Sequence, residues 1–204
     1  MYSNITFSNQ QTFFQKLKSI DYILLICILI IGFISCFAMY STDGGEILYH
    51  TKNHAIRFAL FFTLMLVISF INIKTWFTLS YIFYGVTLLL LMWASLYGIT
   101  ASGSQRWINL YFINLQPSEL MKIAIIVCFA KFYHRAQINQ INNFKNLLVP
   151  MMILILPILL VVSQPDLGTS ILIALSGIIV LWLAGINLKY FVYSGLFLLI
   201  SLPF

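Results

Sequence analysis

Seven long apolar segments restrict what this chain can fold into more than any other feature of its sequence. They cover residues 22–40, 55–73, 77–97, 117–133, 147–162, 169–186 and 188–204. Each is about 16 to 21 residues long, close to the length at which an α-helix crosses a bilayer. Only 8% of the 204 residues are charged, whereas a soluble domain usually has about 25%. This composition excludes an ordinary water-soluble globular domain.

The segments are expected to be helices, because a chain in lipid has to satisfy its own backbone hydrogen bonds. A membrane β-barrel would need shorter segments of alternating polarity, a pattern that this sequence does not show. We therefore predict an all-α fold, a polytopic integral membrane helical bundle with about seven transmembrane helices. In this prediction residues 22–204 form the membrane domain and residues 1–21 precede it.

Lys and Arg indicate the orientation of the helices, since they are more frequent on the cytoplasmic side of a membrane. If the N-terminus lies inside, the outer loops contain only Lys52 and Arg106. The inner segments contain more basic residues, namely Lys16, Lys18, Lys74, Lys131, Arg135, Lys145 and Lys189. The sequence thus predicts that residues 1–21 are cytoplasmic. They are expected to include an interfacial helix, marked by apolar residues at helical spacing: Phe13, Phe14, Leu17 and Ile20.

Two Gln-Pro steps stand at the starts of the fourth and sixth segments. The first is Gln116-Pro117-Ser118-Glu119, and the second is Gln164-Pro165-Asp166-Leu167-Gly168-Thr169. Proline is tolerated in the first turn of a helix, so each step marks a helix start. The two steps are 48 residues apart, which leaves room for one inward and one outward crossing. Both steps are therefore expected on the same, outer face of the membrane.

Polar residues around these steps form the candidate functional site. They are Arg106, Trp107, Gln116, Ser118, Glu119, Lys122, Gln164, Asp166 and Thr169. Ionisable residues at membrane depth usually face a cavity or a polar pathway. A purely structural interpretation of these residues stays open beside the functional one. Glu119 and Asp166 would complement the first turn of a helix, and Glu119 and Lys122 would neutralise each other across one turn. Trp107 would anchor the chain at the membrane interface. His50 and His54 lack a third ligand, so no metal site is predicted from them.

The motifs resemble the SEDS family, the shape, elongation, division and sporulation proteins of bacteria. The resemblance rests on Gly103-Ser104-Gln105-Arg106-Trp107-Ile108 and on the two Gln-Pro steps, in this order. It runs from Asp21 to the end of the chain. Residues 164–185 look most like the rod-shape branch of the family rather than the division branch.

This resemblance implies a glycosyltransferase of the bacterial inner membrane, a bundle of about ten transmembrane helices. Such enzymes polymerise lipid II into the glycan strands of peptidoglycan, here during elongation and cell-shape maintenance. The implied partners are a class B penicillin-binding protein and other membrane proteins of the elongation complex. Nucleic acid is not an expected partner, since the basic residues are scattered among loops. The family's presumed catalytic aspartate falls beyond Phe204, so the chain is expected to match the N-terminal portion and its catalytic residues stay unknown.

The chemistry of the transfer suits the residues present. A carboxylate should accept the proton of the attacking sugar hydroxyl, and cations should stabilise the departing pyrophosphate. A divalent cation, Mg²⁺ or Mn²⁺, could assist, although no ligand set for it is evident. Asp166 is expected to orient the site rather than to act as the base. Two alternatives stay open: a lipid II flippase or transporter, and a non-catalytic scaffold that binds the penicillin-binding protein.

Overall fold

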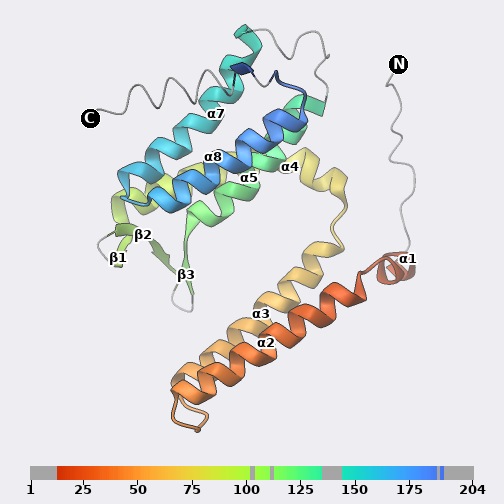
Figure 1. The fold of residues 1–204 in the computed structure, drawn as a ribbon, viewed down its shortest axis with the longest axis vertical. Helices are drawn as coiled ribbons and strands as arrows, with labels where there is room; N and C mark the ends of the chain where they lie inside the picture. Colours follow the sequence, from red (N-terminus) through yellow and green to blue (C-terminus); the bar gives the residue numbers. More distant parts are fainter. Residues whose placement is uncertain (1–12, 102–103, 111–112, 135–143, 188, 191–204) are drawn as a thin grey trace. The chain divides into compact units, whose positions relative to one another are not determined.

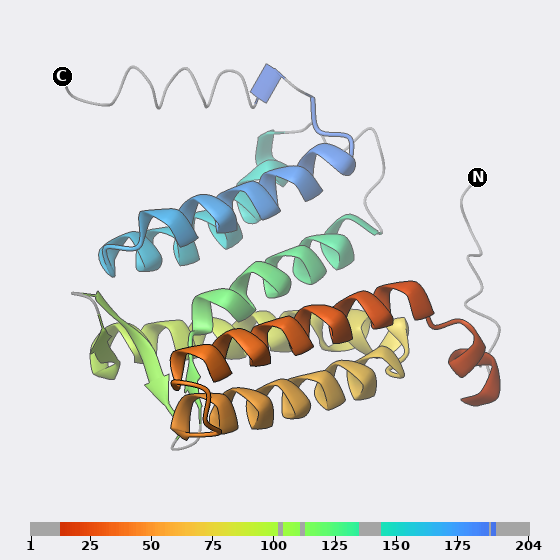
Figure 2. The same cartoon turned by 60° about the horizontal axis from the view of Figure 1, so that its bottom comes forward.

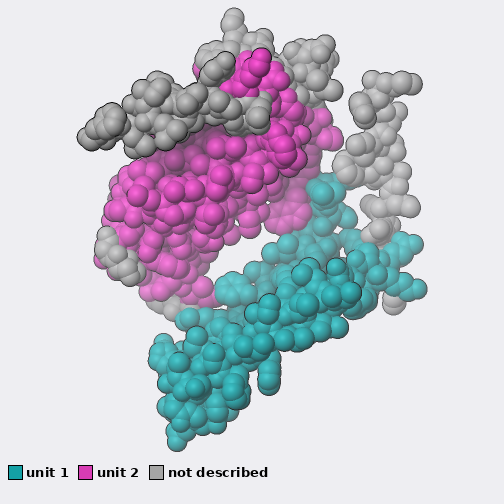
Figure 3. All heavy atoms as spheres, viewed as in Figure 1, with its two compact units in different colours: residues 1–74 teal, residues 75–204 magenta. Residues whose placement is uncertain are grey.

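The computed structural model describes residues 13–101, 104–110, 113–134, 144–187 and 189–190. The chain divides into two compact units, Met1–Lys74 and Thr75–Phe204, coloured separately in Figure 3. Each unit is described by itself.

The first unit is a helical hairpin preceded by a short helix (Figure 1). It contains α1 (Phe13–Lys18), α2 (Tyr22–Thr42) and α3 (Tyr49–Ser69). Asp21 begins α2, because its carboxylate accepts hydrogen bonds from the backbone N–H groups of Ile23 and Leu24. Lys16 of α1 donates a hydrogen bond to the carbonyl of Phe70 at 2.6 Å, which ties the short helix to the end of α3.

A glycine lets the two long helices of the hairpin approach each other. Gly32 is buried in α2, and a Cβ atom there would overlap the ring of Phe58 in α3. At the far end of the hairpin, the backbone N–H and hydroxyl of Thr51 each donate to Asp43 at 2.7 Å. The second predicted span begins at residue 55, whereas α3 begins earlier, at Tyr49, because this contact holds the polar first turns of the helix.

The second unit is a bundle of α4 (Ile73–Tyr97, which begins at the boundary), α5 (Pro117–His134), α7 (Phe144–Ser163) and α8 (Leu167–Leu183). Helix α8 packs against both α5 and α7, and the views in Figures 1 and 2 agree on this arrangement. The core is apolar and includes Leu91, Met121, Phe129, Val161 and Ile173.

Three short strands connect α4 to α5. They are β1 (Ile99–Ala101), β2 (Ser104–Asn109) and β3 (Asn114–Leu115), which pair antiparallel in the order β1-β2-β3. The sequence predicts only a polar loop here. Backbone groups outside a helix still need hydrogen-bond partners, and this segment satisfies them by folding back on itself.

The helical membrane fold is confirmed, and the chain is an integral membrane protein. Helices α2, α3 and α4 are long and apolar enough to cross a membrane. Helix α5 matches the fourth predicted span, but it carries three charged residues, Glu119, Lys122 and Lys131. The apolar parts of α7 and α8 are shorter. The seventh span, residues 188–204, lies outside the described residues apart from 189–190, as do Gly103 and Arg135.

Candidate functional site

One carboxylate joins three separate parts of the second unit. Asp166 precedes α8, and its Oδ1 accepts a hydrogen bond from the backbone N–H of Thr169 at 3.2 Å. Its Oδ2 lies 2.9 Å from Nη1 of Arg106 in β2 and 3.4 Å from Nε2 of Gln116, the residue before α5. Both oxygens of Asp166 therefore have donors, from the residues that the sequence predicted to share one face.

Asp166 is well placed to stay ionised. Its side chain is 10% exposed and that of Arg106 is 26% exposed. Burial raises the pKa of Asp166, but the hydrogen bonds from Thr169 and the charged Arg106 outweigh this effect, so the pKa lies below its ordinary value. A general base works best with a pKa near the working pH. A carboxylate that is stabilised in its charged form, and whose oxygens are occupied, is better suited to position its neighbours.

Gln164 makes a second link beside the first. The residue is buried, and its side-chain Nε2 donates to the carbonyl of Leu91 in α4 at 3.3 Å. Its own carbonyl accepts the hydroxyl of Ser104, which is also buried at the start of β2. The turn between α7 and α8 is thus held against both α4 and β2. Sequence reasoning missed Ser104 as a site residue, although it lies in the motif that also contains Arg106.

Glu119 and Lys122 form a separate ion pair on the first turns of α5. Their Oε2 and Nζ atoms are 2.8 Å apart, at the i, i+3 spacing that the sequence predicted. Glu119 is 56% exposed and Lys122 is 24% exposed. Within the described part of the chain, no hydrogen bond or ion pair connects this pair to Asp166.

Two buried polar groups near the helix starts have no hydrogen-bond partner among the described residues. They are Nε of Arg106 and the hydroxyl of Ser118 in the first turn of α5. Buried polar groups are nearly always satisfied, so these two atoms keep unused hydrogen-bonding capacity. Arg106 thus has one nitrogen on Asp166 and a second, buried nitrogen that has no partner among the described residues.

Trp107 follows Arg106 directly in β2, at a bulge in the ladder with β1. Trp107 is half-buried and lies opposite Ile99, whereas Gln105 lies opposite Thr100, so Arg106 is the extra residue between these two pairs. A bulge interrupts the regular alternation of side chains along a strand. Trp107 therefore stays a candidate site residue beside Arg106.

The divalent cation that could assist the reaction has no evident ligand set among the residues that the structure describes. No group of three His, Cys, Asp or Glu side chains is close enough there to hold a metal ion. His54 instead lies 2.6 Å from the hydroxyl of Ser35. Assistance by a divalent cation stays a prediction.

Comparison with known proteins identifies the family. A family model described as "Cell cycle protein" (FtsW/RodA/SpoVE) matches residues 12–203. The peptidoglycan glycosyltransferase MrdB of Escherichia coli (strain K12) is 33% identical over 180 residues, which make up 88% of this chain and 47% of MrdB. The chain thus spans about half the length of the curated relatives it matches.

Solved structures show the same fold. The rod shape determining protein RodA of Thermus thermophilus superposes with a TM-score of 0.74 at 23% identity, over 91% of this chain and 60% of that one. A chain from a peptidoglycan synthase complex that coordinates polymerization and crosslinking gives a TM-score of 0.76 at 23% identity, over 90% of this chain and 53% of that one. The family model that matches residues 12–203 shows that the chain belongs to the FtsW/RodA/SpoVE family, the SEDS proteins that its motifs resemble.

Proposed function

We propose that the chain corresponds to the N-terminal portion of a peptidoglycan glycosyltransferase that polymerises lipid II during cell elongation. Its family and its similarity to MrdB support this activity. The observation that carries it is the cluster of Arg106, Gln116 and Asp166, in which three polar segments meet at one end of the helical bundle. Transfer joins a sugar 4-hydroxyl oxygen to the anomeric carbon, releases the polyprenyl pyrophosphate and passes the hydroxyl proton to a base.

The residues of this chain have supporting roles in the proposed reaction. Arg106 would face the negative charge that develops on the pyrophosphate, since a preorganised cation in a dry site stabilises such charge. Asp166 would hold the guanidinium in place and balance its charge in the absence of substrate. Lys122, which is paired with Glu119, would add a second cation to the substrate-binding region.

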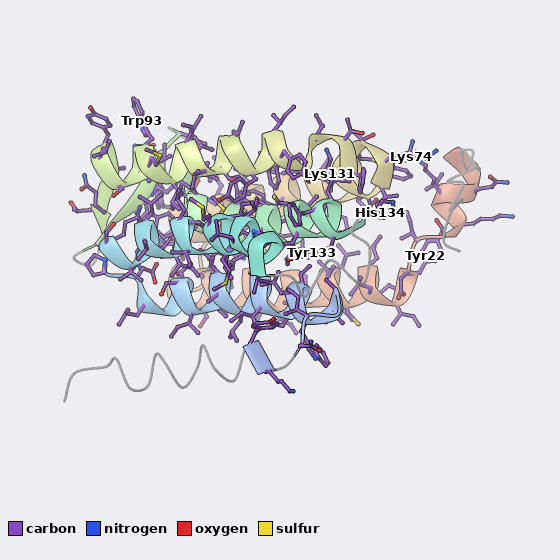
Figure 4. All side chains as sticks on the ribbon, turned by 90° about the horizontal axis from the view of Figure 1, so that it is seen from above. Tyr22, Lys74, Trp93, Lys131, Tyr133 and His134 are labelled. Atoms are coloured by element: carbon purple, nitrogen blue, oxygen red, sulfur yellow. The ribbon has the colours of Figure 1, made fainter. Side chains whose placement is uncertain are left out.

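The location proposed for the protein is the bacterial inner membrane, with the N-terminus in the cytoplasm. The excess of Lys and Arg in the inner segments supports this orientation. Trp93 lies near one end of the second unit, whereas Lys131 and His134 lie toward the other end (Figure 4). A class B penicillin-binding protein and other elongation proteins are the proposed partners. The similarity to a chain of a synthase complex is consistent with that assignment.

Polymerisation of labelled lipid II by the full-length protein tests the proposal. We expect Arg106→Gln to lower the rate by at least about tenfold, and Lys52→Gln, which removes an exposed charge from the other unit, to leave it unchanged. Equal rates for Arg106→Gln and the wild type would refute the role of Arg106. Translocation of lipid II without polymer would favour the flippase, and partner binding without polymer or translocation would favour the scaffold.

A further inference from the structure

The α2–α3 hairpin contains a cavity of about 440 Å³ that the proposed reaction does not use. Side chains of both helices line it. The polar lining residues are Ser35, His54 and Arg57, and the apolar lining residues include Ile31, Phe58 and Phe61. Both helices are long and apolar enough to cross a membrane, so the cavity lies between two candidate membrane-spanning helices.

The polar and apolar walls lie at different depths. Helix α2 runs toward the α2–α3 loop and α3 runs away from it, so Ser35 and His54 lie on the loop side of the cavity. The hydroxyl oxygen of Ser35 and Nε2 of His54 are 2.6 Å apart, and this hydrogen bond fixes the imidazole. Phe61 follows His54 by two helical turns and therefore lies deeper. The cavity is thus polar toward the membrane surface and apolar toward the membrane centre.

Arg57 is the unusual residue of this cavity. Its position is eight residues into α3, about 12 Å along the helix axis at 1.5 Å per residue. The side chain is exposed, and it makes no hydrogen bond or ion pair with any residue that the structure describes. A cation at this depth is costly unless it reaches an anion or the headgroup region. Helical side chains lean toward the N-terminus, which directs Arg57 toward the loop side of the membrane.

We propose that this cavity binds an anionic phospholipid, with its phosphate at Arg57 beside His54 and an acyl chain along Ile31, Phe58 and Phe61. A guanidinium presents paired donors that match the oxygens of a phosphate. A single lipid molecule supplies both the anion and the apolar chain. Its phosphate would lie at the polar end of the cavity, and its acyl chain at the apolar end. An acidic residue on a partner helix would neutralise Arg57 but would leave the apolar end unexplained. This inference does not depend on the proposed glycosyltransferase activity.

Photolabelling tests the proposal on the purified full-length protein in phosphatidylcholine nanodiscs. The probe is phosphatidylglycerol with a photoreactive group in its acyl chain, and the labelled residues are mapped by mass spectrometry. We expect labels on the residues that line the apolar end. Arg57→Gln should reduce the yield by about tenfold, the usual scale for loss of a charge-assisted hydrogen bond. Lys52→Gln removes a charge from the same helix outside the cavity and should leave the yield unchanged.

Two further variants keep the result interpretable. Arg57→Lys retains the cation and should preserve most of the label, even if Arg57→Gln folds poorly. Phe61→Trp fills the apolar end without changing the charge and should reduce the label. Equal labelling of Arg57→Gln and the wild type, or equal labelling by a phosphatidylcholine probe, would overturn the proposal. The proposal would also be overturned if a polyprenyl phosphate competed for the site and removed the label, while the same amount of phosphatidylglycerol did not. Capture of another membrane protein by a photoreactive residue at position 57 would overturn it as well.

Discussion

Arg106 and Asp166 are sixty residues apart in the sequence, yet their side chains meet at 2.9 Å in the structure. The pair lies at the end of the second unit where α5 and α8 begin. Because Asp166 is mostly buried and Arg106 is half-buried, removing one partner leaves the other charge poorly solvated. Loss of either partner is therefore expected to destabilise the second unit as well as to affect the proposed binding of substrate.

The first prediction concerns the charge of Asp166. Asn at this position can still accept a hydrogen bond from Thr169 and cap α8, but it cannot pair with Arg106. We expect Asp166→Asn to lower the free energy of unfolding by about 1 to 3 kcal/mol, measured by denaturant unfolding in detergent. Asp21→Asn is the matched control, since Asp21 caps α2 and is exposed. An equal loss in both variants would show that capping alone explains the effect.

The second prediction concerns pH. Burial raises the pKa of Asp166, but the hydrogen bonds from Thr169 and the contact with Arg106 lower it further. A carboxyl with a lowered folded-state pKa stabilises the protein at every pH above its unfolded pKa, about 3.9. That stabilisation is lost as pH falls through the folded pKa. We expect the unfolding temperature of the wild type to fall more steeply than that of Asp166→Asn from about pH 5 to about pH 3.

Asp43 is the main internal reference for this experiment. Hydrogen bonds from the backbone and side chain of Thr51 lower its pKa as well. Its contribution is present in both proteins, so it cancels when the two curves are subtracted. Parallel curves for the wild type and Asp166→Asn would mean that the folded and unfolded pKa values of Asp166 are equal.

The third prediction concerns the glycine that joins α4 to β1. A Cβ atom at Gly98 would overlap the carbonyl of Ala94 and lie 3.1 Å from the carbonyl oxygen of Trp107. Ala94 belongs to α4 and Trp107 to β2, so a Cβ atom here would displace the backbone at the end of α4 and at the strand that carries Arg106. Gly98→Ala is expected to destabilise the protein by about 1 to 3 kcal/mol. Gly85→Ala is the control, because a Cβ there has nothing within 4 Å and helix propensity favours Ala by up to about 1 kcal/mol.

Opposite shifts in unfolding temperature are thus expected for these two Gly→Ala variants. A loss of stability of the same size in both would contradict the steric explanation for Gly98.

The helices could be predicted because their signals are local. Apolar length identified α2 and α4, and the Gln-Pro step placed the start of α5 at Pro117, where the structure has it. The start of α3 was missed because charged residues lower the hydropathy of its first turns. Strands β1 to β3 were missed because strands this short depend on their pairing partners rather than on any periodicity of their own.

The candidate site was predictable in outline but not in its contacts. Counting crossings places Arg106, Gln116 and Asp166 on one face, and helical spacing gives the Glu119–Lys122 pair. No spacing rule connects Arg106 to Asp166, because their contact depends on how β2 packs over the starts of two helices. For the same reason the sequence could not show that Ser104 bonds to the carbonyl of Gln164.

The fourth prediction tests that link between β2 and the α7–α8 turn. Ser104→Ala removes the buried donor to the Gln164 carbonyl and is expected to cost about 1 to 2 kcal/mol of unfolding free energy. Ser163→Ala is the control, since this exposed hydroxyl donates to Leu160 within its own helix, and it should change stability by less than about 0.5 kcal/mol. Comparable losses of unfolding free energy in the two variants would show that the Ser104 hydroxyl does not help to hold the site together.

The fifth prediction tests which side of the membrane the site faces. Leu167, the first residue of α8, and His134, the last residue of α5, are both exposed. The native cysteines are first replaced by alanine; they are Cys27, Cys36 and Cys128. In spheroplasts, an impermeant maleimide is expected to label Leu167→Cys and Trp107→Cys, and to label His134→Cys only after the membrane is opened. Labelling of positions 107 and 167 from opposite sides would contradict the Arg106–Asp166 contact itself, because one cluster cannot form across a bilayer. Labelling of both from the inside would preserve the cluster but reverse the proposed orientation, and a periplasmic glycosyltransferase site would then be excluded.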